Sequence, residues 1–513
     1  MRYERIKNTR RNMIWGAGEK LLSVLLPFLV RTRLIQTMGL PYAGISGLFT
    51  SILQILSLAE LGMGSAIIYS LYKPLAENDE DTVCALMHYF RGAYRVIGLI
   101  TLGAGVLLIP SLPVFVNESL PDQIQLGVVF LVYLLNASLG YFVFPECKAL
   151  LSATQHNDIT SKVAIMIRIL GSICQLAILS WVPNYYLYIA MVPLCTLLDA
   201  LFSAFSARKM YPTYRCRGQI DSDRKKVLAE KMKGLFVHRI CGSTRNALDN
   251  IFISSFLGIS AVGIYGNYFY VMSSVRNMLD VVTASMSAGV GNSVAMESVE
   301  KNRKDLFTFS FIYEWICGWC TVCLLNLYQP FMRLWMGEER LLGMDAVIAF
   351  CIYFYVWTLG DMKSQYADAR GLWWKDRKRS MAEALCNLLL NWLLVSAFGI
   401  TGVVLATGIS ILFLGFPWGT YILFKDYFGI PQFAAYLRQE GLFALVTLVN
   451  CLITWSVCSL VKDMSIGGLL LRAVLCLAIP NLFYVCCYAR TNSFKSALPL
   501  VRSMLNRREA RKA

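Results

Sequence analysis

The chain has 513 residues, of which 57% are hydrophobic and 16% are charged, and its formal net charge at pH 7 is +16. A chain this apolar leaves little length for a soluble domain, and basic clusters beside apolar segments favour anionic lipid headgroups over nucleic acid as partners. The composition therefore indicates a polytopic membrane protein and excludes a nucleic-acid binder.

Fourteen apolar stretches each have about the ~20 residues that a helix needs to cross a bilayer. In chain order, we expect transmembrane helices at 12–37, 44–70, 96–116, 124–145, 163–181, 187–207, 234–257, 264–291, 307–330, 344–369, 381–398, 403–424, 439–461 and 467–489. Of the 48 Lys and Arg, 36 lie in the N-terminus, the even-numbered loops and the C-terminus, whereas the odd-numbered loops hold three. This asymmetry predicts that both termini lie in the cytoplasm.

A weak internal repeat relates the two halves of the chain. Gly39 and Gly44, at the turn between the first two spans, match Gly258 and Gly263, at the turn between spans seven and eight, with the same offset in both pairs. Glycine suits a tight turn because it adopts positive φ without strain. Since the first and seventh spans run in the same direction, the repeat is parallel, as in transporters built from two rocking lobes.

We therefore expect an all-α polytopic fold of about 14 transmembrane helices, with two six-helix lobes related by the repeat and two extra C-terminal helices. The expected parts are a first lobe at 1–207, a basic cytoplasmic linker at 208–233, a second lobe at 234–424, the additional helices at 425–489 and a basic cytoplasmic tail at 490–513.

Eight charged residues lie well inside four spans, in corresponding helices of the two halves: Arg31, Arg33, Glu60, Arg239, Arg245, Asp249, Arg276 and Asp280. Each charge costs roughly 2.5–3.5 kcal/mol at a helix centre, so these side chains must face one another or a water-filled cavity. Arg245 with Asp249, and Arg276 with Asp280, have the i,i+4 spacing of local salt bridges, which leaves a structural and a functional role equally open. Five bases against three acids favour an anionic ligand.

The remaining charges in these spans have no residue of opposite charge within one helical turn. Arg31 and Arg33 point in different directions, and we expect at least one to line a cavity while the other reaches the outer interface. Glu60 is either the partner of an arginine on another helix or a site for a proton or cation. Four charges at the inner end of the tenth span form either a gate or, as we expect, a solvated helix end: Asp361, Lys363, Asp368 and Arg370.

Motifs of catalysis are absent from the sequence. It contains neither a phosphate-binding Gly-x-x-x-x-Gly-Lys-Ser/Thr loop, nor a Gly-x-Ser-x-Gly elbow, nor a His-Glu-x-x-His motif. Cys317, Cys320 and Cys323 share one helix face, but with only three His in the chain we interpret them as helix-packing residues. We expect no enzyme activity, no metal site and no cofactor, while coupling to H⁺ or Na⁺ stays open.

Several stretches of the sequence are similar to one transporter family. They are Gly39-Leu-Pro-Tyr-Ala-Gly-Ile-Ser-Gly-Leu-Phe49, Leu56-Ser-Leu-Ala-Glu-Leu-Gly62, Leu71-Tyr-Lys-Pro-Leu-Ala76, Leu150-Leu-Ser-Ala-Thr-Gln155 and Gly371-Leu-Trp-Trp-Lys-Asp376. They resemble the polysaccharide-transport and O-antigen (Wzx-type) flippases of the multidrug/oligosaccharidyl-lipid/polysaccharide (MOP) exporter superfamily.

The resemblance implies a flippase of the bacterial inner membrane that moves an undecaprenyl-diphosphate-linked oligosaccharide to the outer leaflet by alternating access. Membrane lipids and other polysaccharide-assembly proteins would be its partners. The implied substrate-binding residues are Arg31, Arg33, Arg239, Arg245 and Arg276. The implied ion-coupling or gating residues are Glu60, Asp249 and Asp280. A lipid II flippase and a cation-coupled multidrug exporter of the same superfamily are the alternatives.

Overall fold

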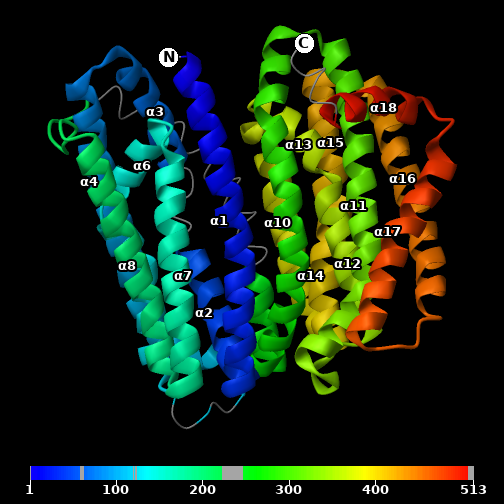
Figure 1. Cartoon of the computed structure of the whole chain (residues 1–513), viewed down its shortest axis with the longest axis horizontal. Coiled ribbons are helices and arrows are strands. Elements are labelled where there is room, and N and C mark those ends of the chain that lie inside the picture. The colour runs from blue at the N-terminus through cyan, green and yellow to red at the C-terminus, as the bar shows by residue number, and fades with distance from the viewer. Residues whose placement is uncertain (1, 58–62, 119–120, 122–123, 222–246, 506–513) are drawn as a thin grey trace. The chain divides into compact units, whose positions relative to one another are not determined.

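The structure, a computed structural model, describes residues 2–57, 63–118, 121, 124–221 and 247–505. These residues are helices and short connections, with no β-strand among them. Their contacts divide the chain into two compact units, Met1–Gly263 and Ile264–Ala513 (Figure 1). The predicted all-α fold is confirmed.

The first unit consists of long helices with short connections. In chain order its elements are α1 (Arg2–Thr37), α2 (Leu40–Leu56), α3 (Met63–Glu77), α4 (Glu80–Leu108), the 3₁₀ helix η2 (Ile109–Phe115), α5 (Leu126–Phe142), α6 (Pro145–Ala153), α7 (Asn157–Trp181), α8 (Tyr185–Met210) and a helix at Ala247–Leu257. The most extensive helix packing in this unit is between α1 and α7.

The second unit contains longer helices and the chain's C-terminal end. Its elements are α10 (Ile259–Met296, whose first turn belongs to the first unit), α11 (Val299–Met336), η3 (Glu338–Arg340), α12 (Met344–Leu359), α13 (Asp361–Ala369), α14 (Trp373–Ser410), the π-helix η4 (Ile411–Gly415), α15 (Phe416–Leu423), the π-helix η5 (Phe424–Phe428), η6 (Ile430–Gln432), α16 (Phe433–Cys458), α17 (Ile466–Tyr488) and α18 (Asn492–Leu505).

Eight helices in the described part of the chain are long and apolar enough to cross a membrane. The long helices α1 and α10, which contain Arg31 and Arg276, are not among them. Large apolar side chains such as Leu107, Trp181 and Leu460 are more than three-quarters exposed. Such side chains suit lipid rather than water, as expected for a multi-span membrane protein.

Several predicted spans consist of two helices instead of one. The fourth is bent by 53° between α5 and α6, and the tenth is divided between α12 and α13. The second is divided between α2 and α3, around residues outside the described part. Spans eleven and twelve run together in α14, where Gly399 has a non-helical φ of 58° that marks the turn between them. The sequence located these apolar stretches but not their breaks.

The helix boundaries confirm the internal repeat. The interval along the chain from the start of α2 to the start of α10 equals the interval from the start of α4 to that of α11. The residues before α2 and α10 are Gly39 and Gly258, with φ of 101° and 95°. The residues before α4 and α11 are Asp79 and Ser298, whose side chains each accept a hydrogen bond from a backbone N–H of the first turn.

The second part of each half repeats with its own, slightly shorter interval. The interval from the start of α6 to that of α13 equals the interval from α7 to α14, and α6 and α13 both have nine residues. Just beyond the end of each short helix, Gln155 and Gly371 have φ of 63° and 65°. The same left-handed turn therefore joins the short helix to the next span in both halves, although only the second copy has a glycine there.

The starts of α2 and α10 cross at their glycines. A Cβ at Gly44 would overlap the carbonyl oxygen of Ile259, the first residue of α10. A Cβ at Gly263 would lie 2.8 Å from the carbonyl oxygen of Leu40, the first residue of α2. The contact is reciprocal, since the repeat relates Gly44 to Gly263 and Leu40 to Ile259. Glycine is required here because the two backbones touch.

Two features of the described structure concern the predicted domain boundaries. The helix Ala247–Leu257, which we expected to open the second lobe, contacts the first unit, where Asn250 donates to Ser51 (2.8 Å). In the segment expected to be a basic tail, α18 forms a helix with Phe494 and Ala497 packed against α11, α16 and α17. The linker predicted at 208–233 lies largely outside the described residues. The predicted lobe boundaries therefore remain a prediction.

The reciprocal crossing predicts a large effect of a single methyl group. Gly44→Ala should lower the melting temperature of the purified protein, because overpacking costs about 1–3 kcal/mol. Gly103→Ala in α4 is the matched control, since a Cβ there meets nothing within 4 Å and alanine favours the helix. Differential scanning fluorimetry in detergent measures both, and equal melting temperatures would contradict the close approach.

Candidate functional site

Arg276 of α10 lies at the centre of a charged cluster in the second unit. Its Nη1 contacts the Asp280 carboxylate at 2.5 Å and its Nη2 contacts that of Asp361 at 2.9 Å. The hydroxyl of Tyr313 donates to the other carboxylate oxygen of Asp361 at 2.5 Å. The ring of Trp357 lies 5.3 Å from the guanidinium carbon. Four helices, α10 to α13, thus meet around one arginine.

Burial distinguishes the two acids of this cluster. The side chain of Arg276 is 10% exposed and that of Asp361 is 17% exposed, whereas the side chain of Asp280 is 51% exposed. A buried ion requires a buried partner, so Asp361 is the structural counterion. Asp280 is the more exposed of the two partners. The predicted i,i+4 pair is confirmed, and Asp361 is a third member that the sequence did not reveal.

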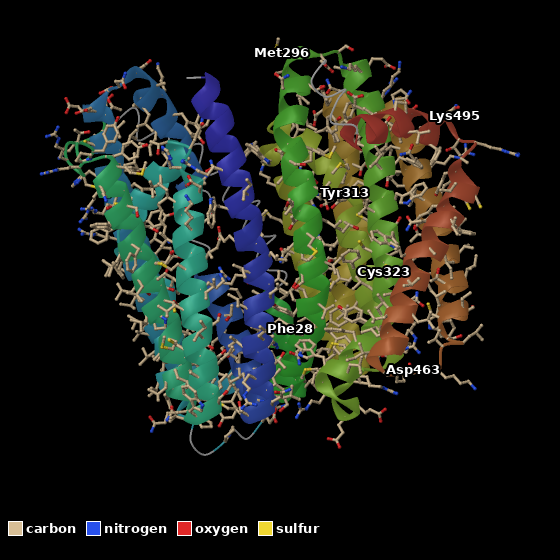
Figure 2. All side chains as sticks on the ribbon, in the orientation of Figure 1. Phe28, Met296, Tyr313, Cys323, Asp463 and Lys495 are labelled. Atoms are coloured by element: carbon tan, nitrogen blue, oxygen red, sulfur yellow. The ribbon has the colours of Figure 1, made fainter. Side chains whose placement is uncertain are left out.

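Figure 2 locates this cluster along the second unit. Tyr313 is labelled on α11, between the end marked by Met296 and Lys495 and the opposite end marked by Asp463. Tyr313 lies about four turns from the start of α11. The cluster is therefore within the helical bundle and not at its rim.

A second buried network adjoins the first through Lys363. Arg379 of α14 donates to Asp376 (2.5 Å) and to Glu383, both on its own helix. Lys363 of α13 is 8% exposed, and a Cβ at Gly419 would lie 2.5 Å from its Nζ. The ammonium therefore occupies the space that a side chain at position 419 would fill.

The expectation of a solvated helix end was wrong for half of its residues. Asp361 is mostly buried and Lys363 is buried, because both lie in the first turn of α13, which packs against α11 and α15. Asp368 and Arg370, at the end of α13, are exposed as expected. Among the described residues, no group of three or more His, Cys, Asp or Glu has the geometry to hold a metal ion.

Arg31 and Arg33 of α1 contact different neighbours in the first unit. Arg31 Nη2 donates to the backbone carbonyl of Gly263 (3.3 Å), next to the crossing of α2 and α10. Arg33 Nε donates to the hydroxyl of Ser180 on α7 (3.3 Å). Both side chains are half-buried. Their opposite directions follow the prediction, whereas their roles toward a substrate stay a prediction.

A cluster of hydroxyl groups lies near Arg31 and was not apparent in the sequence. Tyr133 donates to Ser46 (2.7 Å), Ser46 contacts the hydroxyl of Tyr185 (3.1 Å), and Tyr185 donates to the carbonyl of Tyr42 (3.2 Å). The charge of Arg31 acts on Tyr133. Tyrosine is common in apolar spans, so only the three-dimensional arrangement identifies this cluster.

The other predicted site residues are less informative. Asp249 is fully buried in the helix Ala247–Leu257. Glu60, Arg239 and Arg245 lie outside the described residues, so their predicted roles remain predictions.

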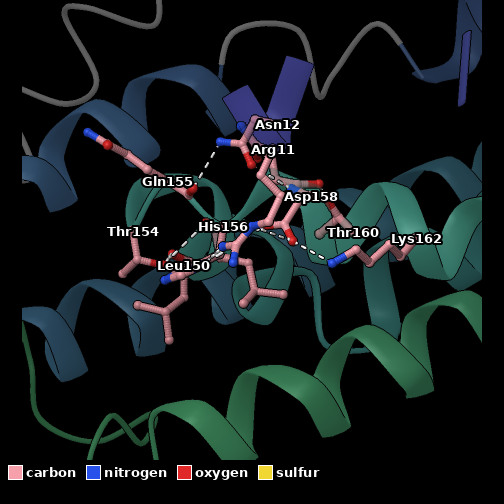
Figure 3. Close-up of polar contacts among 11 residues, drawn as sticks. Arg11, Asn12, Leu150, Thr154, Gln155, His156, Asp158, Thr160 and Lys162 are labelled. Atoms are coloured by element: carbon pink, nitrogen blue, oxygen red, sulfur yellow. Dashed lines mark hydrogen bonds and ion pairs between the residues drawn. The ribbon is translucent and has the colours of Figure 1, made fainter. Parts of the chain in front are cut away.

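The start of α1 is bound to the turn between α6 and α7 (Figure 3). Arg11 forms an ion pair with the buried carboxylate of Asp158 (2.8 Å) and donates to His156 Nδ1 (3.0 Å). Asn12 donates to the carbonyl of Gln155 (2.9 Å) and accepts from the backbone N–H of Asp158 (2.9 Å). The motif that carries the family resemblance at 150–155 therefore shapes a turn that holds α1.

Breaking the buried ion pair should cost more than breaking the exposed one. Asp361→Asn is expected to destabilise the protein by about 3–5 kcal/mol, because it leaves Arg276 without its buried counterion. Asp280→Asn should cost about 1 kcal/mol or less, since its carboxylate is half exposed. Thermal unfolding of the purified variants compares them. Equal losses would mean that burial does not distinguish the two acids.

The stability of the turn that holds α1 should depend on pH. Burial, followed by the charge of Arg11, lowers the pKa of His156 below its usual value. The folded state thus favours neutral His156. The stability that this contributes to the folded state is fully present above about pH 6.5 and is lost as the pH falls below that value. Amide exchange at residues 154–160, corrected for intrinsic rates, should therefore accelerate as the pH falls. His156→Gln should abolish this acceleration, whereas His88→Gln, at an exposed position, should retain it.

Comparisons with known proteins identify the fold. No protein-family model and no curated protein matches the sequence. The structure of the lipid II flippase MurJ in an inward closed conformation is similar, with a TM-score of 0.65, 15% identity, and coverage of 93% of this chain and 98% of that chain. An inward-facing multidrug resistance MATE transporter of the MOP superfamily has a TM-score of 0.59, 15% identity, and coverage of 78% and 94%.

A third similar structure is the Vibrio cholerae MATE transporter VcmN in its bent form. Its TM-score is 0.55 with 14% identity, and the match covers 85% of this chain and 98% of that chain. All three proteins are transporters whose chains are matched almost completely. The present chain therefore has the helical, multi-span membrane fold of the transporters of the MOP superfamily.

Proposed function

We propose that the chain is a flippase that moves a lipid-diphosphate-linked oligosaccharide between membrane leaflets for surface-polysaccharide assembly. The observation that carries the proposal is the placement of arginines inside the bundle of a MOP-type fold. Arg33 donates to the hydroxyl of Ser180, and Arg31 donates to the carbonyl of Gly263 beside the crossing of α2 and α10. Arginine binds phosphate through a two-pronged guanidinium that lysine lacks, which suits a diphosphate.

Arg276 suggests how binding is coupled to a conformational change. In the described state its guanidinium is neutralised by Asp280 and Asp361. An incoming phosphate competes with the half-exposed Asp280, while Asp361 keeps the arginine in position. Asp280, once displaced, is free to take up a proton or Na⁺, which is the role that the family resemblance implies for it.

Two alternative functions have support of their own. A lipid II flippase is favoured by the similarity to MurJ. A multidrug exporter is favoured by the MATE-type structures. An exporter of cationic drugs should prefer acids over arginines in its binding site. Arg31 and Arg33 therefore favour an anionic substrate.

Removing the charges of Arg31 and Arg33 should strongly reduce transport without lowering the amount of protein in the membrane. In a strain that lacks its own copy, the Arg31→Gln, Arg33→Gln double variant should reduce surface-glycan export about 10-fold or more, equivalent to ~1.4 kcal/mol of lost binding. The double Lys variant should retain part of the export, because it keeps the charge but loses the two-pronged contact. Protein abundance is measured in parallel by immunoblot.

The matched control is Lys462→Gln, which removes one charge from an exposed loop residue between α16 and α17. It should export normally. Full export by the double Gln variant would contradict a cationic binding site. Rescue of cells depleted of their lipid II flippase would favour the first alternative, and resistance to cationic dyes would favour the second.

A further inference from the structure

Two glutamates that the proposed function does not use are buried in the second unit. Glu314 of α11 and Glu440 of α16 are each 2% exposed. Each lies about two turns or more inside its helix, which begins at Val299 or Phe433. Sequence patterns did not single them out, because both lie near the predicted inner ends of their spans, where a carboxylate normally reaches water.

The neighbouring contacts show that the two glutamates face each other. One turn before them, the hydroxyls of Ser310 and Tyr436 lie 3.1 Å apart. One turn after Glu314, a Cβ at Gly318 would lie 2.8 Å from the hydroxyl oxygen of Thr447. Both contacts advance along the two helices together, so α11 and α16 run in the same direction, and Glu314 lies near Glu440 because Ser310 and Tyr436 each precede a glutamate by one turn. The two carboxylates are also close enough to interact electrostatically, which agrees with this placement.

Neither carboxylate has a counterion in the described structure. Glu314 Oε2 and both carboxylate oxygens of Glu440 are buried without a hydrogen bond of good geometry, and the polar groups next to them are the hydroxyls of Tyr355 and Tyr436. The ion pairs between described residues involve neither of them, although the buried acids Glu146, Asp158 and Glu383 each have a basic partner. The burial of Glu314 and Glu440 therefore differs from that of Glu146, Asp158 and Glu383.

The surroundings of the pair contain further acids and weak acids. The titratable groups that interact with it come from five of the helices around it: Cys317 of α11, Tyr355 of α12, Asp361 of α13, Tyr436 of α16 and Tyr488 of α17. The hydroxyl of Tyr355 lies near Glu314 but is itself buried without a hydrogen-bond partner. A carboxylate in such an environment is stable only when it is neutralised.

We propose that Glu314 and Glu440 form a proton-binding site that holds α16 against α11. Two carboxylates cannot both be ionised in one buried site, so the pair binds at least one proton and titrates as a unit. With a proton between them, one carboxyl group donates to the other, and the unpartnered oxygens become satisfied. Loss of the proton separates α16 from α11, or admits water between them.

The proton site adjoins the charged cluster around Arg276. Glu314 follows Tyr313, which donates to Asp361, and the charge of Asp361 acts on Glu314. Deprotonation of the pair adds a negative charge beside the counterion of Arg276. The protonation of the pair and the ion pairing of Arg276 are therefore linked, whichever substrate the protein moves.

Infrared spectroscopy of the purified, full-length protein in lipid nanodiscs tests the site directly. At neutral pH the protein should show a carbonyl stretching band of a protonated carboxylic acid, which shifts in ²H₂O. The Glu314→Gln, Glu440→Gln double variant should lose this band. The Glu383→Gln variant should retain it, because Glu383 is ion-paired with Arg379. A band that is unchanged in the double variant would overturn the proposal.

Thermal unfolding across pH provides an independent measurement. A site that binds more protons in the folded state than in the unfolded state loses stability as the pH rises, so the melting temperature should fall from about pH 6 to about pH 9. Glu440→Gln, which mimics the protonated group, should reduce this fall by about half or more relative to Glu383→Gln. A Glu440→Gln protein that fails to fold would contradict the proposal, because the neutral form should be the stable one.

The same experiment distinguishes a proton from a metal cation. The melting temperature is measured at fixed pH and ionic strength in sodium, potassium and choline chloride. A proton site predicts equal melting temperatures in all three salts. Stabilisation by sodium or potassium that disappears in Glu440→Gln would replace the proton with a metal cation and overturn the proposal.

Discussion

The cost of placing charge in a low-dielectric environment governs the interior of this protein. An ion within the bundle must be compensated by another side chain, by water or by a proton. Around Arg276 the compensation is nearly complete, since one acid is buried with it and a second is half exposed. The packing of α10 to α13 follows from this requirement, because the arginine and its partners come from four different helices.

The fold was largely predictable from the sequence, and the exceptions have a common cause. Length and apolarity locate a span, but they do not reveal a bend within it. The short helices α6, after the 53° bend, and α13 are more polar than the helices before them, and a polar stretch does not distinguish a bend from the end of a span. The amphipathic helix α18 was missed because it lies in the segment 490–513, which was interpreted as a basic tail, whereas Phe494 and Ala497 pack it against the bundle. Helix boundaries that depend on packing can be located only from the structure.

The candidate site was predictable only where its partners are close in sequence. The pair Arg276 and Asp280 follows from helical spacing alone. Asp361, far along the chain from Arg276, was expected to be solvated and instead is the buried counterion. Glu314 and Glu440 were not predicted at all, because a single glutamate near the end of a span does not indicate what faces it. These residues come together only through contacts between helices that are far apart in the sequence.

The reciprocal crossing of α2 and α10 has an evolutionary meaning. Gly44 faces the first residue of α10, and Gly263 faces the first residue of α2. In a two-fold symmetric dimer, a residue i of one subunit contacts a residue j of the other, and residue j of the first subunit contacts residue i of the second. Such a contact is called isologous. If a single gene encoding one half once dimerised through this surface, one glycine would have served both sides. In the present chain the two halves differ in most residues, but both glycines are there, each against the start of the other helix.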